Sequence, residues 1–268
     1  MHPLRIGTQG WNYTDWVGPF YPEGTRPARF LELYARAFDT VEVDSTFYAV
    51  PSPSTVEGWA ERTPDDFTFT LKLPGEITHE ARLRGSEALL AEFWERVRLL
   101  GAKLGPVLVQ MGPDFGPRER PALADFLAGL PDDVRVAVEF RHPGWAGDDT
   151  LALLAEHGVA FTLSDGPWIP RARLREIALC PTVPFHYLRW MGLDRALTDH
   201  SRVQTDRGAE ADAWAATLAP LLESGTEVWA YTSNFWEGHA PASAAGLQRR
   251  LGQLPVDSAA LVEQTSLF

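Results

Sequence analysis

Short runs rich in β-branched and aromatic residues alternate along this chain with longer stretches in which apolar residues recur three or four positions apart. The first pattern is typical of buried strands and the second of helices that cover a sheet. Eight strands are predicted, at Leu4–Thr8, Thr40–Val43, Phe67–Leu73, Pro106–Met111, Val134–Phe140, Val159–Leu163, Phe185–Trp190 and Glu227–Thr232. Because strands that alternate with helices form parallel sheets, we expect an α/β protein: a single (β/α)8 TIM-type barrel domain spanning residues 1–268.

Two of the helical segments carry local signals of their own. Ser54 followed by Glu57 has the spacing of a capping box and predicts the start of the helix after the second strand. The stretch Pro167–Ile177, after the sixth strand, contains Pro170, which disfavours a helix interior. This stretch is therefore expected to be an irregular, lid-like loop with at most a short helix.

Strand parity sorts the polar side chains, because alternate residues of a barrel strand face the helices and the interior. The inward set on the second to fifth strands comprises Glu42 and Asp44, then Thr68, Thr70 and Lys72, then Gln110, and then Ala137, Glu139 and Arg141. On the seventh strand Tyr187, Arg189 and Met191 share a parity, as do Val228, Ala230, Thr232 and Asn234 on the eighth; which set faces inward is left open there. Polar residues at the carboxyl ends of barrel strands mark a binding or catalytic site.

The resulting pocket carries an unusual number of charges. Its candidate lining is Glu42, Asp44, Glu139 and Asp165 against Lys72, Arg141 and Arg189, with His79 and His142 on the following loops. One interpretation is a set of buried salt bridges that merely fills the barrel mouth. Burial of ion pairs is often neutral or costly for stability, so seven such charges favour a functional pocket.

Aromatic residues gather in the same predicted loops. They are Trp11, Trp16, Tyr48, Trp145, Trp168 and Trp236. Each one alone is explained by packing, but together they could stack on a sugar ring or a base. A ring-bearing, small-molecule ligand at the carboxyl-terminal face is the expected partner.

Overall composition restricts the partners further. The formal net charge of −12 disfavours nucleic acid and anionic membranes. The first residues lack the pattern of a signal peptide and no apolar run approaches the roughly 18 residues of a membrane span, so a cytoplasmic protein with no membrane partner is expected. Cys180, the single cysteine, excludes a disulfide within the chain and a cysteine-based zinc cage, and is interpreted as a small buried hydrophobe.

Familiar cofactor and nucleophile motifs are missing. The sequence has no GxGxxG, no phosphate-binding loop ending in Lys-Ser or Lys-Thr, no HExxH and no GxSxG. Glu139 and Asp165 with a histidine could hold a divalent metal, but their spacing is not diagnostic, so a metal is disfavoured and no other cofactor is indicated. His239 is interpreted as the cap of the last helix.

Several segments together resemble a known family. They are Gly7–Trp11, Val41–Tyr48, Ile77–His79, Leu104–Gln110 and Ala137–His142, with further matches at Tyr187–Arg189, Asn234 and Gly238–Ala240. The chain resembles the YecE-like family, also called domain of unknown function 72. This resemblance implies a TIM-barrel fold but no established reaction, substrate or cofactor.

The sequence departs from that family pattern in three places. Asp44 stands where an asparagine is usual, Met191 where a histidine is common, and Ser233 where an asparagine often stands. The change at Met191 excludes a histidine-dependent metal site or general base on the seventh strand, which further disfavours a metal.

Three functions remain as hypotheses. The first is an enzyme of hydrolase or lyase type acting on a small sugar-like or phosphorylated substrate, with Glu139 and Asp165 as the general acid/base pair, and with Lys72 and Arg141 shaping their pKa values and holding an anionic group. Arg189 would assist. The second is a metal-assisted phosphodiester activity of nucleic-acid repair type, against which the net charge argues. The third is a barrel that binds a ligand without chemistry.

Overall fold

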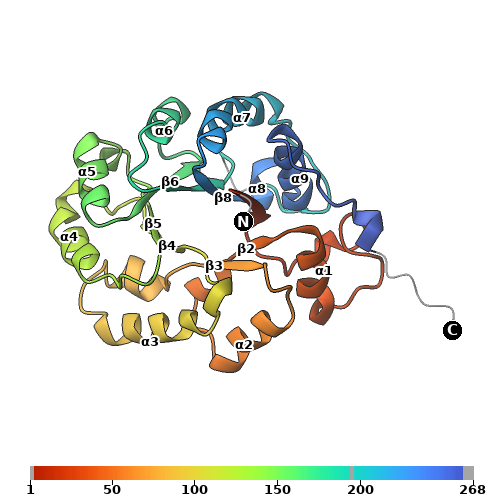
Figure 1. Ribbon diagram of the computed structural model, residues 1–268, viewed down its shortest axis with the longest axis horizontal. Coiled ribbons are helices and arrows are strands. Elements are labelled where there is room, and N and C mark those ends of the chain that lie inside the picture. Colours follow the sequence, from red (N-terminus) through yellow and green to blue (C-terminus); the bar gives the residue numbers. More distant parts are fainter. Residues whose placement is uncertain (1–2, 194–195, 262–268) are drawn as a thin grey trace.

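A computed structural model describes residues 3–193 and 196–261. Its strands are β1 (Leu4–Thr8), β2 (Thr40–Val43), β3 (Thr68–Leu71), β4 (Val107–Gln110), β5 (Val136–Glu139), β6 (Ala160–Asp165), β7 (Phe185–Trp190) and β8 (Glu227–Thr232). Its helices are α1 (Phe30–Ala37), α2 (Pro53–Glu61), α3 (Glu87–Arg98), α4 (Arg120–Ala128), α5 (Asp148–Glu156), α6 (Arg171–Ala178), α7 (Gly208–Glu223), α8 (Asn234–Glu237) and α9 (Ala240–Arg250). Figure 1 shows the helices arranged around the strands.

All strand pairs are parallel, as the alternating pattern predicts. Continuous ladders give a six-stranded sheet in the order β1-β8-β7-β6-β5-β4, a half-barrel, and a two-stranded sheet of β2 and β3. Isolated parallel bridges connect the two sheets, from Gln9 to Glu42 on one side and from Phe69 to Leu104 and Lys72 to Leu108 on the other. The α/β fold with a parallel sheet is therefore confirmed, while an unbroken eight-stranded ladder is not present.

The side-chain parity predicted for the strands agrees with the packing. A cluster of Leu108, Ala137, Ala160, Phe185, Tyr187, Trp229 and Tyr231 fills the space that the strands enclose, and a larger apolar cluster lies between strands and helices. The parity of β8, which the sequence left open, is thereby settled: Trp229 and Tyr231 face inward, and Val228 and Ala230 face the helices. α9 packs against β1 and β8.

Three local predictions need correction. α2 begins at Pro53 with Ser52 as its N-cap, whose hydroxyl accepts from the Thr55 amide at 3.2 Å, so Ser54 is not the cap. The segment after β6 contains a regular helix, α6, because Pro170 stands before its first turn and not inside it. Cys180 follows α6 and is exposed, whereas a buried position was expected.

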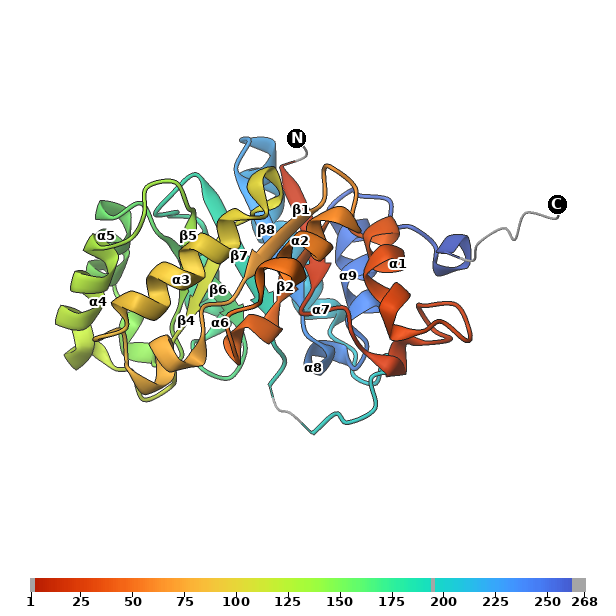
Figure 2. The same cartoon turned by 90° about the horizontal axis from the view of Figure 1, so that it is seen from below.

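Several segments that follow strands lie at the carboxyl ends of those strands. α8 and part of the chain between β7 and α7 lie beyond the carboxyl ends of the strands (Figure 2).

Within the described ranges no helix is both long and apolar enough to cross a bilayer.

Candidate functional site

A cavity of about 830 Å³ opens at the carboxyl ends of the strands. A volume in this range suits a small-molecule ligand. Charged and polar groups reach it from the ends of β2, β3, β4, β5 and β7, namely Asp44, Lys72, His79, Gln110, Arg141 and Arg189. Aromatic residues complete its wall: Trp11, Tyr13, Phe47, Tyr48, Trp59 and Phe235. The structure therefore has a cavity at the carboxyl ends of the strands, where the sequence analysis expected the pocket.

The Arg189 side chain is buried between the carboxylates of Glu42 and Glu139. It makes a two-point contact with Glu42, from Nη2 to Oε1 at 2.7 Å and from Nε to Oε2 at 3.0 Å. Its Nη1 donates to Oε2 of Glu139 at 2.6 Å. Arg141 Nε donates to the other oxygen of Glu139 at 2.8 Å, and the Tyr187 hydroxyl donates to Glu42 at 2.7 Å. The fixed fork of a guanidinium suits such paired recognition.

The two buried glutamates are in different electrostatic states. Burial raises the pKa of Glu42 to about 7, which Arg189 only partly counteracts and which the Asp44 charge reinforces. Burial acts in the same direction on Glu139, but Arg189 and Arg141 outweigh it and hold the pKa of Glu139 at about 2. Glu139 is therefore a fixed anion near neutral pH, whereas Glu42 can gain or lose a proton.

Lys72 lies immediately after β3, and its main chain is held by Thr46, whose hydroxyl donates to the Lys72 carbonyl at 2.6 Å. The Lys72 ammonium sits 4.0 Å from the centroid of the Phe47 ring. No carboxylate of the described chain forms an ion pair with it, and no hydrogen bond of the described residues reaches its Nζ. Burial, together with the neighbouring Arg189 charge, lowers the pKa of Lys72 to about 8.

The other polar groups that line the cavity are a carboxylate, an imidazole and an amide. Asp44 is half-buried, and its Oδ1 lies 3.5 Å from Arg189 Nη2 without a hydrogen bond of its own. Gln110 Nε2 lies 3.3 Å from His79 Nε2 and donates to the Met111 carbonyl at 2.6 Å. Burial and the Lys72 and Arg141 charges lower the pKa of His79, so its ring is neutral near pH 7.

Four of the predicted site residues lie elsewhere. Asp165 faces the helices: its carboxylate accepts from Arg171 Nε at 2.7 Å and from Trp214 Nε1 at 2.6 Å. Asn234 Oδ1 accepts from the indole of Trp16 at 3.2 Å and from the Ala240 amide at 3.0 Å. Neither side chain lines the cavity. Their hydrogen bonds instead hold helices and loops in place. The Asp165 carboxylate is therefore bound on the helix side of β6 and does not line the cavity.

His142 and Trp145 also have structural contacts. His142 Nδ1 accepts from the Gly144 amide at 3.0 Å at the start of a short turn. Trp145 is buried, stacks on Phe115 and Phe140, and donates to the Phe115 carbonyl at 2.6 Å. Neither residue lines the cavity.

The aromatic residues predicted for the rim divide into two groups. Trp11 lines the cavity edge-on to Trp59, with ring centroids 5.9 Å apart, and Tyr48 is 85% exposed at its mouth. Trp168 stacks under the Arg141 guanidinium, whose central carbon lies 4.0 Å from the ring centroid. Trp16 and Trp236 are fully buried and belong to the core.

Tyr13, Phe47 and Trp59 are pocket residues that the sequence reasoning did not select. Phe47 lies within the segment Val41–Tyr48, so its place directly after the second strand could have indicated it. Trp59 comes from α2, and a helical residue carries no strand-end signal that would point to the cavity.

His239 has the N-cap position of α9, but the Asn234 side chain caps this helix instead, through the Ala240 amide. His239 Nδ1 lies 2.8 Å from the His200 carbonyl. Among the residues that the structure describes, no cluster of three His, Cys, Asp or Glu side chains has the arrangement of a metal site.

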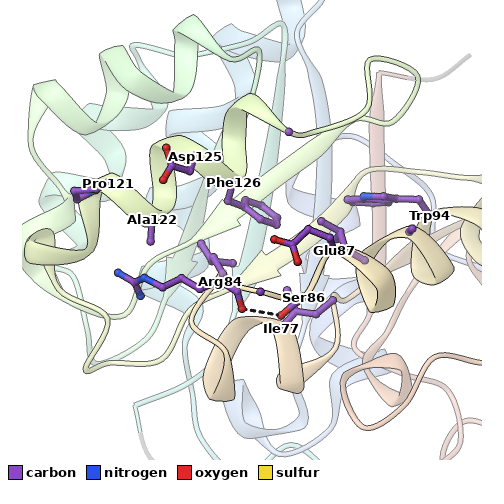
Figure 3. A pocket seen from close by; sticks show the side chains of 14 residues that line it. Ile77, Arg84, Ser86, Glu87, Trp94, Pro121, Ala122, Asp125 and Phe126 are labelled. Carbon is purple, nitrogen blue, oxygen red and sulfur yellow. Dashed lines mark hydrogen bonds between the residues drawn. The ribbon is translucent and has the colours of Figure 1, made fainter.

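A second cavity, of about 580 Å³, lies between α3 and α4 (Figure 3). Trp94 and Phe126 form part of its apolar wall, and Arg84, Glu87 and Asp125 stand at its edge. Arg84 is already paired with Glu119 at 2.6 Å. This groove lacks the convergence of buried charges that distinguishes the cavity at the strand ends.

The parallel strands, the helices between them and the charged cavity at the strand ends define an α/β protein with a polar cavity at the carboxyl ends of its strands. The pattern of the family described as "Protein of unknown function DUF72" matches residues 5–265, and the chain belongs to this family.

Relatives support the assignment over most of the chain. UPF0759 protein YecE of Escherichia coli strain K12 is 36% identical over 238 residues, which cover 82% of this chain and 85% of that protein. The crystal structure of the DUF72 family protein TM1631 of Thermotoga maritima has a TM-score of 0.79 at 26% identity and covers 93% of this chain and 99% of its own. The DUF72 family protein EF0366 of Enterococcus faecalis has a TM-score of 0.76 at 21% identity, covering 95% and 97% of the two chains.

Proposed function

We propose that this protein is an enzyme that binds a small, anionic, ring-bearing molecule in the strand-end cavity and moves protons on it with Lys72. The observation that carries the proposal is the position of Lys72: its ammonium borders a cavity of about 830 Å³, lies on a phenyl ring, and has no carboxylate partner in the described chain. An amine with a pKa of about 8 exchanges protons readily near neutral pH. The Lys72 ammonium is therefore suited to act on a ligand.

Arg141 provides the complementary anion contact. Its Nε is bound to Glu139 and its planar face rests on Trp168, which together fix its direction. Its two Nη atoms have no hydrogen bond among the described residues, and Arg141 lines the cavity. A guanidinium held in this way can bind a carboxylate or phosphate at two points.

Glu139, buried beneath the cavity, and Asp44, which lines it, have unequal roles in this scheme. Glu139 is bound through both oxygens to guanidinium groups, so it neutralises them and does not transfer protons. Asp44 borders the same cavity as Lys72 and is the carboxylate able to accept a substrate proton. A glycoside hydrolase needs two carboxylates on either side of the bond, so the loss of Asp165 from the site removes the basis of a hydrolase reaction and favours isomerase or lyase chemistry.

Closure of the barrel supports the same site. We infer that the eight strands form one (β/α)8 barrel in which β2 and β3 complete the wall. What supports this closure is the set of isolated bridges on both sides of the two-stranded sheet. The cavity would then have the position at which TIM-barrel enzymes hold their active sites.

Ligand-dependent thermal stability tests the proposal. The full-length protein is screened with sugars, sugar phosphates, carboxylic acids, nucleotides, divalent ions and short duplex DNA. A ligand at about 100 times its Kd stabilises the folded state by about 2.7 kcal/mol, which corresponds to a rise in Tm of about 5 °C for a chain of this size.

Matched variants locate the bound molecule. The rise in Tm is expected to disappear in Arg141→Met and to persist in Arg98→Met, whose guanidinium pairs with Asp133 on the outer surface at 2.7 Å. A rise that survives Arg141→Met would refute the assignment of the anion contact. A rise with duplex DNA alone would favour the nucleic-acid hypothesis instead.

A further inference from the structure

Lysine is rare in this chain. Of its 24 cationic Lys and Arg residues, 22 are arginine, and the two lysines are Lys72 and Lys103. An arginine would bind an anion at least as well as a lysine, and its guanidinium stays charged at any pH that a protein tolerates. A lysine among so many arginines therefore points to chemistry that needs an amine.

The two lysines have different surroundings. Lys103 Nζ donates to the carbonyl oxygens of Ala60 at 2.6 Å and Thr63 at 2.8 Å, so it ties the end of α2 to the segment before β4. Lys72 is 8% exposed, borders the cavity, and makes no such contact within residues 3–193 and 196–261. Lys103 therefore has structural partners, whereas Lys72 faces the space in which a ligand would bind.

The geometry points to a covalent role: Lys72 forms an imine with an aldehyde or ketone, so the substrate class of the pocket is a small anionic carbonyl compound. Imine formation rests on the proposed function, because the same cavity must admit the ligand. Arg141 is placed to bind the anionic group of such a compound, and Trp11 and Trp59 would cover its carbon skeleton.

The chemistry requires an uncharged amine, which burial and the nearby guanidinium groups favour. With a pKa of about 8, about one in ten Lys72 side chains is neutral at pH 7, against about one in 2500 for a lysine of ordinary pKa. Amines activated in this way, by desolvation or by a cationic neighbour, are known Schiff-base nucleophiles.

The atoms balance without any additional reactant. The Nζ lone pair attacks the carbonyl carbon, and the carbonyl π electrons move to its oxygen. That oxygen takes a proton from water while Nζ gives one to Asp44, which yields a neutral carbinolamine. Asp44 returns this proton to the hydroxyl, the carbon–oxygen bond breaks, and water leaves while the Nζ lone pair forms the C=N bond of a protonated imine. No net oxidation or reduction occurs.

Reductive trapping tests the inference. The full-length protein is incubated with pyruvate, glyceraldehyde 3-phosphate or dihydroxyacetone phosphate in the presence of sodium cyanoborohydride, which reduces an imine to a stable secondary amine. Peptide mapping by mass spectrometry then locates the adduct. At least one of the three probes is expected to give about tenfold more adduct on Lys72 than on Lys103 at pH 7, at a rate that rises with pH and levels off above about pH 8.

Two conservative variants complete the design. Lys72→Arg keeps the charge but cannot form an imine, so its adduct is expected to vanish; Lys103→Arg is expected to label like the wild type. Equal labelling of the two lysines, or no adduct on Lys72 with any of the three probes, would overturn the covalent role. A ligand-induced rise in Tm that depends on Arg141 would still stand in that case, so failure of the covalent role is distinguishable from failure of the binding site.

Discussion

Replacing each buried glutamate by glutamine separates their roles. Glu42 and Glu139 are both fully buried and both bind Arg189, so the substitutions Glu42→Gln and Glu139→Gln are matched in shape and environment. They differ in what the carboxylate charge contributes, because two guanidinium groups bind Glu139 and one binds Glu42.

The magnitudes follow from the pKa values. A shift of one pKa unit corresponds to about 1.4 kcal/mol, so a folded-state pKa of about 2 for Glu139, against an ordinary value near 4.3, is worth about 3 kcal/mol. This pKa is lowered by folding, so the stabilisation is complete above the ordinary pKa and is lost as the pH falls toward 2. For Glu42 the folded-state pKa of about 7 is raised, so ionisation costs about 4 kcal/mol above pH 7, and this cost disappears below the ordinary pKa.

Urea unfolding between pH 5 and pH 8 checks these signs. Glu139→Gln is expected to lower the free energy of unfolding by about 3 kcal/mol at every pH in this range. Glu42→Gln is expected to gain about 2 to 3 kcal/mol relative to the wild type as the pH rises from 5 to 8, because the variant has no carboxylate to ionise. Equal losses in both variants with the same pH dependence would refute the unequal stabilisation of the two carboxylates.

Three further substitutions test the site and its surroundings. Gly75→Ala would place a Cβ atom 2.7 Å from the far end of the Phe47 ring, so we expect a loss of about 1 to 2 kcal/mol in the free energy of unfolding. Because the Lys72 ammonium lies on this ring, we also expect weaker imine trapping at Lys72 when the ring shifts. Asp165→Asn removes the buried charge bound to Arg171 and is expected to cost about 2 kcal/mol in urea unfolding without changing any ligand-induced rise in Tm. Trp11→Ala, at the half-buried cavity wall, is expected to raise the Kd of a ring-bearing ligand about tenfold in calorimetric titration while changing Tm of the free protein little.

Strand positions and their parity could be predicted from the sequence because they follow from local patterns. The predicted strand at Phe185–Trp190 coincides with β7, and the inward placement of Glu42, Lys72 and Glu139 follows from the two-residue period alone. These residues meet in space because parallel strands bring their carboxyl ends to one side. Hence the charged cluster, though scattered over most of the chain, was predictable.

The contacts of residues at the ends of strands were less predictable. Asp165 is the last residue of β6 and has the outward parity of Leu163, but its charge made it look like part of the pocket. Its partner Trp214 comes from α7, far along the chain, and no local pattern announces that hydrogen bond. Cys180 was assigned to the core on residue type, yet it stands in the exposed turn after α6, where no packing constraint applies.

The net charge of the protein and the local charge of its cavity act differently on large and on small anions. A chain with a formal charge of −12 repels an extended polyanion over its whole surface, whereas a small anion that enters the cavity feels the Lys72 and Arg141 groups at short range. Glu42 and Glu139 balance the charges of Arg189 and Arg141, but the two Nη atoms of Arg141, the ammonium of Lys72 and the carboxylate of Asp44 stay available for contact with a ligand. We therefore expect a compact molecule that carries one anionic group and one group that exchanges protons to bind more tightly than a nucleic-acid strand in a direct titration of both.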